Sequence, residues 1–176
     1  TYIIEALSPI YHDDRFADHR DEIGEVICRE IDILVKRQAA EGGWGYYDFG
    51  HSRETPVGNQ STSFNTAAVL YAFDVAMEAG FDVPEDTIHD AIYCVERMRL
   101  PSGAYVYGQC ALMSPQAGYN KVKGSLGRSQ SCNIALWEFD RDITKDELLA
   151  GIADMREHHH FMEIGKCRPY PHEAWY

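Results

Sequence analysis

The chain of 176 residues contains an approximate internal repeat whose copies are offset by 60 to 61 residues. A shift of 61 places Gly42 on Gly103 and Trp44 on Tyr105, and it also aligns the apolar positions that precede them. A repeat of this length is a supersecondary unit that must bury its apolar face against its neighbours. The repeat therefore predicts an architecture of stacked, similar units.

Two further pairs of similar segments extend this repeat. The stretch 82–86 matches 142–146 at an offset of 60, and each is followed by apolar residues at helical spacing. An inner segment is matched as well, and its pairing sets Ser63, Asn65 and Ala67 against Ser131, Asn133 and Ala135. Each copy is thus predicted to contain two segments of secondary structure.

The first copy has two helical patterns of different character. From about Asp14 to Ala40, apolar residues recur at three- and four-residue spacing, which predicts an amphipathic helix that ends at the glycine pair 42–43. Residues 62–79 are apolar with few polar interruptions, and Gly80 follows them. A helix that is apolar nearly all round must be surrounded by protein.

The alternation continues along the chain. Pro84 opens a third, amphipathic helix, and residues 129–139 form a fourth with few charges. Thr144 and Glu147 have the spacing of a capping box at the start of a fifth helix. Residues 104–107 are the candidate for a short strand, and 158–176 are expected to form a loop and the start of another inner helix.

The pattern predicts an all-α chain that forms a single helical-repeat domain over residues 1–176. Amphipathic helices would lie outside with one wet face, and apolar helices would lie inside, covered by the outer ones. Helical hairpins in a ring or a solenoid satisfy this arrangement.

Charge and composition exclude several classes of partner. The net charge of −12 argues against a nucleic acid or an anionic membrane, because both require clustered Lys and Arg. No window approaches the roughly 20 apolar residues of a transmembrane helix. Five cysteines occur without a CxxC pair, and Cys28, Cys94 and Cys132 fall in apolar helical patterns, where a thiol is expected to act as a small hydrophobe. A soluble protein is expected, with the cytoplasm slightly favoured.

The run from Gln38 through Gly42 to Trp44 has the form Q-x3-G-x-W. It resembles the repeats of squalene/hopene cyclases and the related prenyltransferase β-subunits, and the resemblance extends from about residue 20 to the end. It implies an α/α toroid in which inner helices surround a central cavity. It also implies that the chain is part of a longer toroid, completed by further residues or by a partner subunit.

The chain lacks the catalytic and metal-binding motifs of this family. The Asp-x-Asp-Asp motif of the cyclases is absent, and the nearest string, at 140–143, reads Asp-Arg-Asp-Ile. No set of Asp, Cys and His matches the prenyltransferase zinc site, so we expect neither a metal nor another cofactor. Whether the chain is an enzyme is left open, since a fold alone does not imply an activity.

Three residues are the candidates for acid–base chemistry. His172 and Glu173 are adjacent after Pro171, and a His beside a carboxylate could transfer a proton. The alternative is that Glu173 stabilises a helix N-terminus and His172 forms a hydrogen bond with a loop carbonyl. Asp74 interrupts the most apolar helix, and a buried carboxyl needs a partner or a raised pKa; the alternative is that Asp74 lies at the exposed end of that helix.

Two other clusters have stronger structural explanations. Asp140 and Asp142 could be paired acids, but they lie where one helix ends and the next turn begins, which favours capping or solvation. The histidines at 158–160, with Glu163, invite a metal interpretation. Consecutive histidines point in different directions on a helix, so we expect no metal there.

Aromatic residues at the repeat turns are the candidates for ligand contact. In a cyclase such rings would line the cavity and stabilise carbocations; in a sugar-binding toroid they would stack on pyranose rings. The alternative is packing between repeats, expected above all for Trp44 and Trp137. The candidate substrate-binding residues are Trp44, Tyr46, Tyr47, Tyr105, Tyr107 and Trp175.

Three functions remain open at this point. The first, implied by the resemblance, is a terpene-cyclase- or prenyltransferase-like protein that binds or cyclises an isoprenoid in a central cavity. The second is a toroidal carbohydrate-active enzyme, such as a polysaccharide lyase, with a saccharide ligand. The third is a non-catalytic helical-repeat protein that binds a partner by its concave face.

Overall fold

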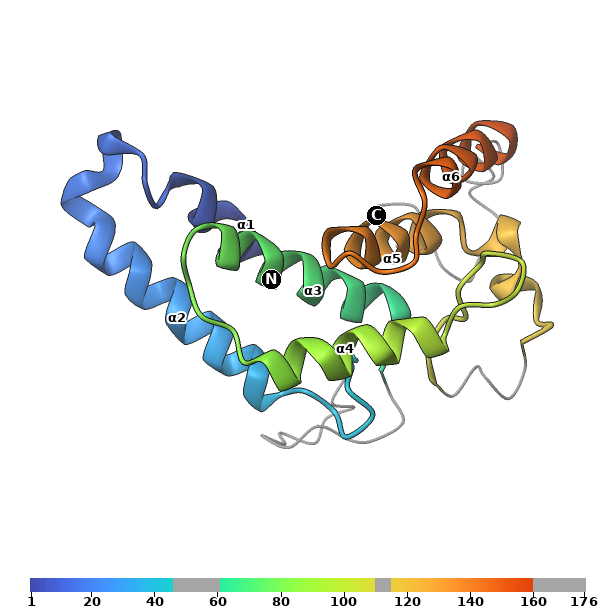
Figure 1. The fold of residues 1–176 in the computed structure, drawn as a ribbon, viewed down its shortest axis with the longest axis horizontal. Helices are drawn as coiled ribbons and strands as arrows, with labels where there is room; N and C mark the ends of the chain where they lie inside the picture. Colours follow the sequence, from blue (N-terminus) through green and yellow to red (C-terminus); the bar gives the residue numbers. More distant parts are fainter. Residues whose placement is uncertain (46–60, 110–114, 160–176) are drawn as a thin grey trace.

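The computed structural model describes residues 1–45, 61–109 and 115–159, and within these ranges the chain is all-α (Figure 1). Six α-helices and four short 3-10 segments carry the described chain, and no strand is present among these residues. Extended backbone pairing occurs as two isolated bridges, Thr62 with Gly108 and Arg99 with Tyr105. The all-α prediction is confirmed; the short strand expected at 104–107 is wrong, because only Tyr105 of that segment pairs there.

The first hairpin consists of an outer and an inner helix. After the short helix α1 (Tyr2–Leu7) and the 3-10 segments η1 (Ser8–Ile10) and η2 (Asp14–His19), helix α2 runs over Arg20–Lys36. Helix α3 (Ser63–Glu78) is the inner helix. The long helix expected from residue 14 is therefore interrupted, because non-helical φ and ψ angles at Phe16 break the backbone before α2 begins.

The second hairpin repeats this order and a third outer helix follows it. Helix α4 (Glu85–Arg97) is amphipathic, and α5 (Leu126–Glu138) is the second inner helix, preceded by the 3-10 segments η4 (Gly118–Asn120) and η5 (Val122–Gly124). Helix α5 begins three residues earlier than the sequence pattern indicates. Helix α6 (Lys145–His158) starts with the predicted capping box, in which Thr144 and Glu147 bond each other's backbone N–H groups.

The core lies around the two inner helices. Helices α3 and α5 make the most extensive helix–helix contact, and α4 lies against α3 (Figure 1). Leu70, Phe73 and Ala76 of α3 are fully buried, whereas α2 buries one stripe, Ile23, Ile27 and Ile31. Helix α3 is more fully buried than the outer helices, as expected, but α3 and α5 each keep an exposed apolar stripe, so the expected full cover of the inner helices is not present among the described residues. Closure into a toroid stays a prediction.

The cysteines divide between the core and the surface. Cys94 and Cys132 are fully buried, as expected, and burial raises the pKa of both thiols, to about 12 for Cys132. Cys28 is exposed, so its expected role as a small core residue is wrong: it lies beside, and not within, the buried stripe of α2. Within the described residues, no helix has both the length and the apolar character that crossing a bilayer requires.

Candidate functional site

The Q-x3-G-x-W turn forms a hydrogen-bonded joint between one outer helix and the next. Gln38 Nε2 donates to the carbonyl oxygens of Gly42 and Thr87, each at 2.8 Å, and Thr87 belongs to the first turn of α4. Trp44 Nε1 donates to Leu34 O at 2.9 Å, and the Trp44 side chain is 5% exposed. The motif therefore holds α2, the turn and α4 together.

Both glycines of this turn are required by close packing. Gly42 has a φ of +92°, and a Cβ atom there would overlap the Asp90 carbonyl. A Cβ atom on Gly43 would lie 2.5 Å from Thr66 Oγ1 and 2.8 Å from Cys94 Sγ. The α4 backbone can approach the turn only because these side chains are absent.

The second turn keeps this geometry with different side chains. Arg99 stands at the position of Gln38 and forms an ion pair with Glu147, which stands at the position of Thr87. The ring of Trp44 packs edge-on against Phe73, with centroids 5.9 Å apart. In the second copy, the Tyr105 hydroxyl instead donates to Asn133 Oδ1 at 2.9 Å.

These contacts correct the alignment of the inner helices. Phe73 and Asn133 are equivalent by their partners, and their offset is 60 residues. Gly80 and Asp140, which both have positive φ after the ends of α3 and α5, show the same offset. The predicted pairing of Asn65 with Asn133 is therefore wrong. That pairing uses an offset of 68 residues, which displaces α5 along α3 by about two helical turns relative to the offset of 60 given by these contacts.

Sequence reasoning missed a buried cation, Arg128 in the first turn of α5. Its side chain is 0% exposed, and its Nε donates to Tyr105 O at 3.0 Å. Its guanidinium also lies over the Tyr107 ring, 5.5 Å from the centroid. In the sequence, Arg128 is a single charged residue at the edge of a segment with few charges, and this was the only sign of its burial. The predicted helix start at Ser129 placed Arg128 in the preceding loop, whereas α5 begins at Leu126.

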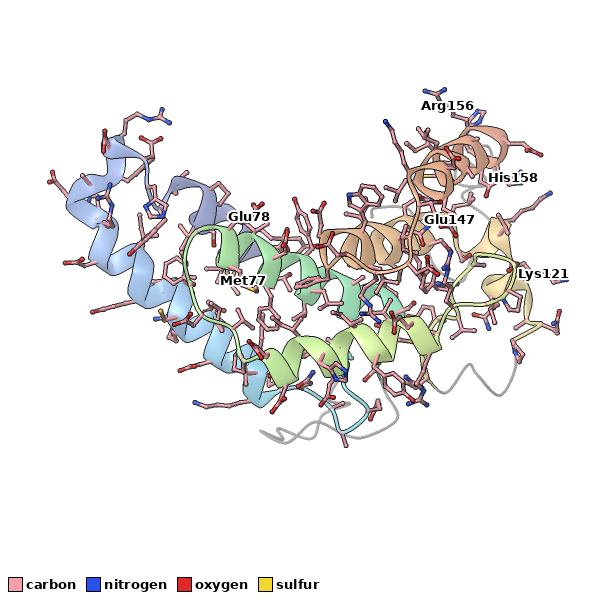
Figure 2. All side chains as sticks on the ribbon, in the orientation of Figure 1. Met77, Glu78, Lys121, Glu147, Arg156 and His158 are labelled. Atoms are coloured by element: carbon pink, nitrogen blue, oxygen red, sulfur yellow. The ribbon has the colours of Figure 1, made fainter. Side chains whose placement is uncertain are left out.

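Helices α3 and α5 each have an exposed stripe in the C-terminal half, and the electrostatic effect of Glu138 on Asp74 places the two stripes close together. Tyr71, Ile134 and Trp137 are between 41% and 43% exposed, unusually open for large apolar side chains on inner helices. Acidic side chains lie beside them, and Figure 2 shows Glu78 at the C-terminal end of α3. We call this set the acid–aromatic face; it consists of Tyr71, Asp74 and Glu78 on α3 and Ile134, Trp137 and Glu138 on α5.

Asp74 is the half-buried acid of this face. Desolvation is the main cause that raises the pKa of Asp74, and the nearby carboxylates of Glu138 and Glu78 raise it further. Of the two conditions stated for a buried carboxyl, a partner or a raised pKa, Asp74 has the raised pKa, and its catalytic role stays a prediction.

The other predicted aromatic residues divide between core and surface. Trp44 and Tyr105 are 5% and 0% exposed, which favours packing over ligand contact. Tyr107 is partly buried between Arg128 and Phe64. Trp137, expected to pack, is instead 42% exposed. Several predicted site residues lie outside the described residues, namely Tyr46, Tyr47, His172, Glu173 and Trp175.

The remaining polar clusters show no convergent site. Asp140 and Asp142 are exposed at the end of α5, and Asp140 takes the left-handed conformation with a φ of 53°. His159 Nδ1 lies 2.7 Å from Arg156 O, while His160 and Glu163 lie beyond the described chain. Among residues 1–45, 61–109 and 115–159, no group of three or more potential ligands could hold a metal ion.

A cavity of about 760 Å³ lies between the end of α4, the second turn, α5 and α6. The volume is within the range of small-molecule sites. Glu147 marks its position in Figure 2, where α6 begins beside α5. Its polar wall includes Arg99, Gln130, Asn133, Glu147 and Asp154, and its apolar wall includes Leu100, Val122 and Leu126.

Part of the chain is similar in sequence to a known protein. No protein-family model matches the chain. A stretch of 86 residues, 49% of this chain, is 29% identical to an alpha-2-macroglobulin of Thermotoga maritima. The stretch corresponds to 5% of that protein, so this chain spans only a small part of its length.

Proposed function

We propose that this chain belongs to an α/α toroid related to the terpene cyclases and prenyltransferase β-subunits, and that it binds an isoprenoid on the acid–aromatic face. The observation that carries the proposal is Asp74, a carboxyl whose pKa is raised beside exposed apolar side chains. An isoprenoid is an apolar chain, and its burial against Tyr71, Ile134 and Trp137 would release water from all of these surfaces.

The same face has the groups that protonation of a double bond requires. A carboxyl can protonate an alkene only from its neutral form, which a raised pKa favours. The Asp74 carboxyl would transfer its proton to an alkene carbon, so that a C–H bond forms and a carboxylate and a carbocation remain. The rings of Tyr71 and Trp137 would stabilise that cation through their π faces. Loss of a proton from the product cation would return the carboxyl to its neutral form.

Ligand binding can be tested with farnesol and a matched pair of tyrosines. Tyr71 lies on the acid–aromatic face, whereas Tyr93 is 55% exposed on α4. We expect Tyr71→Ala to weaken binding about tenfold, the effect of about 1.4 kcal/mol of lost burial, and Tyr93→Ala to leave it unchanged. Absence of farnesol binding by the native chain, or equal losses in both variants, would contradict the proposed ligand.

Catalysis requires a separate test because binding alone does not establish it. Native protein and Asp74→Asn should be incubated with squalene and with farnesyl diphosphate, and the products analysed by mass spectrometry. We expect cyclised product only with the native chain, since Asn cannot donate the proton. If Asp74→Asn forms as much product as the native protein, Asp74 is not the acid; if the native protein binds farnesol and forms no product, a non-catalytic binding role is favoured.

The saccharide alternative finds less support in the described residues. A polysaccharide lyase of the expected kind needs an acid- and His-lined cleft. The polar cavity beside α6 contains carboxyl groups, but no histidine lines it within the described chain.

A further inference from the structure

The cavity beside α6 exists because the second turn is not closed as the first one is. In the first copy, the Asp90 carbonyl of α4 lies directly against Gly42. In the second copy, nothing lies within 4 Å of the Cβ position of Gly103, which has a similar φ of +80°. Gly103 and Ala150, the equivalent of Asp90, both line the cavity. The space is therefore specific to the second repeat.

Side chains that differ between the copies make this space polar. The turn residue is Arg99 where the first copy has Gln38, and the inner-helix residue is Asn133 where the first copy has Phe73. Asn133 is 5% exposed and lines the cavity. Its Oδ1 accepts the Tyr105 hydroxyl, but its Nδ2 donates to no other described residue. The Nδ2 atom is not among the side-chain nitrogens buried without a partner, so it is open to the cavity and can donate to a bound polar group.

Gln130 supplies a second amide to the same wall. Its side-chain amide lies directly over Gly151 of α6, where a Cβ atom would overlap it. No described residue forms a hydrogen bond with this amide, so it has both a donor and an acceptor available to a ligand. The cavity thus contains neutral hydrogen-bonding groups from two turns of α5.

The charges of the cavity do not balance. Arg99 is paired with Glu147, and Glu96 accepts from Arg141 Nε at 2.8 Å. Asp154 lines the cavity from α6 and has no charged partner within the described chain. Among the described residues, one negative charge of the cavity lining is therefore left without an ion-pair partner.

From these groups we propose that the cavity binds a small molecule that has a primary ammonium group next to neutral hydrogen-bonding groups. The ammonium group pairs with Asp154, and neighbouring carbonyl or hydroxyl oxygens accept from Asn133 Nδ2 and Gln130 Nε2. The aliphatic part of the ligand packs on Leu100 and Leu126. An ammonium donates three hydrogen bonds, which a carboxylate and amide oxygens can accept. The site is independent of the acid–aromatic face.

The test measures binding of two chemically different amines, glucosamine and glycylglycinamide, by titration calorimetry at about pH 6.5, below the usual pKa of an α-amino group. The N-acetyl form of each serves as the uncharged control. Asp154→Asn removes the unpaired charge, and Asp146→Asn is its control on α6, because Asp146 is exposed and does not line the cavity. Gln130→Leu removes the second amide at similar volume.

We expect at least one of the amines to bind to the native chain and its N-acetyl form to bind at least tenfold more weakly. Asp154→Asn should lose at least tenfold in affinity, Gln130→Leu about threefold or more, and Asp146→Asn less than twofold. The proposal is overturned if neither amine binds, or if Asp154→Asn and Asp146→Asn bind equally well. Farnesol binding should be unchanged in Asp154→Asn, which separates this site from the proposed isoprenoid site.

Discussion

Arg99 in the second turn stands where Gln38 stands in the first, and each side chain reaches the outer helix that follows. Gln38 does so through two hydrogen bonds to carbonyl oxygens, Gly42 O and Thr87 O. Arg99 instead forms an ion pair with Glu147 and donates to Asp142 O at 3.4 Å. The same joint is thus neutral in the first copy and ionic in the second.

This difference predicts different responses to salt. We expect Gln38→Ala to lower the free energy of unfolding by about 1–2 kcal/mol at any salt concentration, because it removes two hydrogen bonds to partly buried carbonyls. Arg99→Ala should lower it by about 0.2–1 kcal/mol, and the loss should shrink at 1 M salt because the pair is partly exposed. Urea unfolding at low and high salt measures both, and a salt-dependent loss in Gln38→Ala would contradict the neutral joint.

The two turn glycines form a matched pair for a packing test. We expect Gly42→Ala to destabilise the chain by more than 2 kcal/mol, since it combines a left-handed backbone with a clash against Asp90. Gly103→Ala should lower stability by only about 1–2 kcal/mol, because its backbone is also left-handed but its surroundings are open. Thermal and denaturant unfolding give both values, and equal losses would mean that the space beside Gly103 closes in solution.

The Tyr105 hydroxyl provides a third test. Tyr105→Phe leaves Asn133 Oδ1 buried without its donor, so we expect a loss of about 1–3 kcal/mol in the free energy of unfolding. Tyr93→Phe is the control, because the Tyr93 ring is exposed and surface changes are usually within about 0.5 kcal/mol. A loss in Tyr105→Phe no greater than the control would show that the hydrogen bond contributes little.

Asp74 gives the chain a pH-dependent destabilisation. Because its pKa is raised by folding, ionisation of Asp74 weakens the native state at neutral pH, and this penalty disappears below the ordinary aspartate pKa of 3.8. We expect Asp74→Asn to raise the unfolding temperature at pH 7. This gain should shrink as the pH falls through the raised pKa of Asp74, and it should be absent below the ordinary value of 3.8.

An exposed carboxylate is the control for that experiment. Asp18 lies at the surface in η2, and Asp18→Asn makes the same change in net charge. The gain at pH 7 should occur in Asp74→Asn and not in Asp18→Asn. Equal gains would attribute the effect to the overall negative charge and not to the position of Asp74.

The sequence predicted those parts of the fold that depend on local pattern. The apolar run 62–79 became α3 to within one residue at each end, and the Thr144 capping box starts α6 as expected. Asp74 was recognised because a carboxylate in an apolar helix is conspicuous. These signals are short-range, so one sequence is enough to detect them.

Features that depend on contacts across the fold were not predictable in this way. Arg128 donates to the carbonyl of Tyr105, which is 23 residues away, and no spacing along the chain indicates this contact. The cavity is lined by residues from α4, the second turn, α5 and α6, so it appears only when these distant segments are brought together. The exposure of Trp137 likewise depends on which neighbours cover α5.

Helix α6 buries only Gly151 completely, and Leu149 and Ile152 remain 53% and 46% exposed. Besides its packing on α5, α6 is joined to the second turn by Glu147, whose pKa is lowered first by the Thr144 backbone N–H and hydroxyl and then by Arg99. That contribution is present above the ordinary glutamate pKa and is lost as the pH falls through the lowered value. Acid below the ordinary glutamate pKa should therefore weaken the attachment of α6, and its amide protons should exchange before those of the two inner helices.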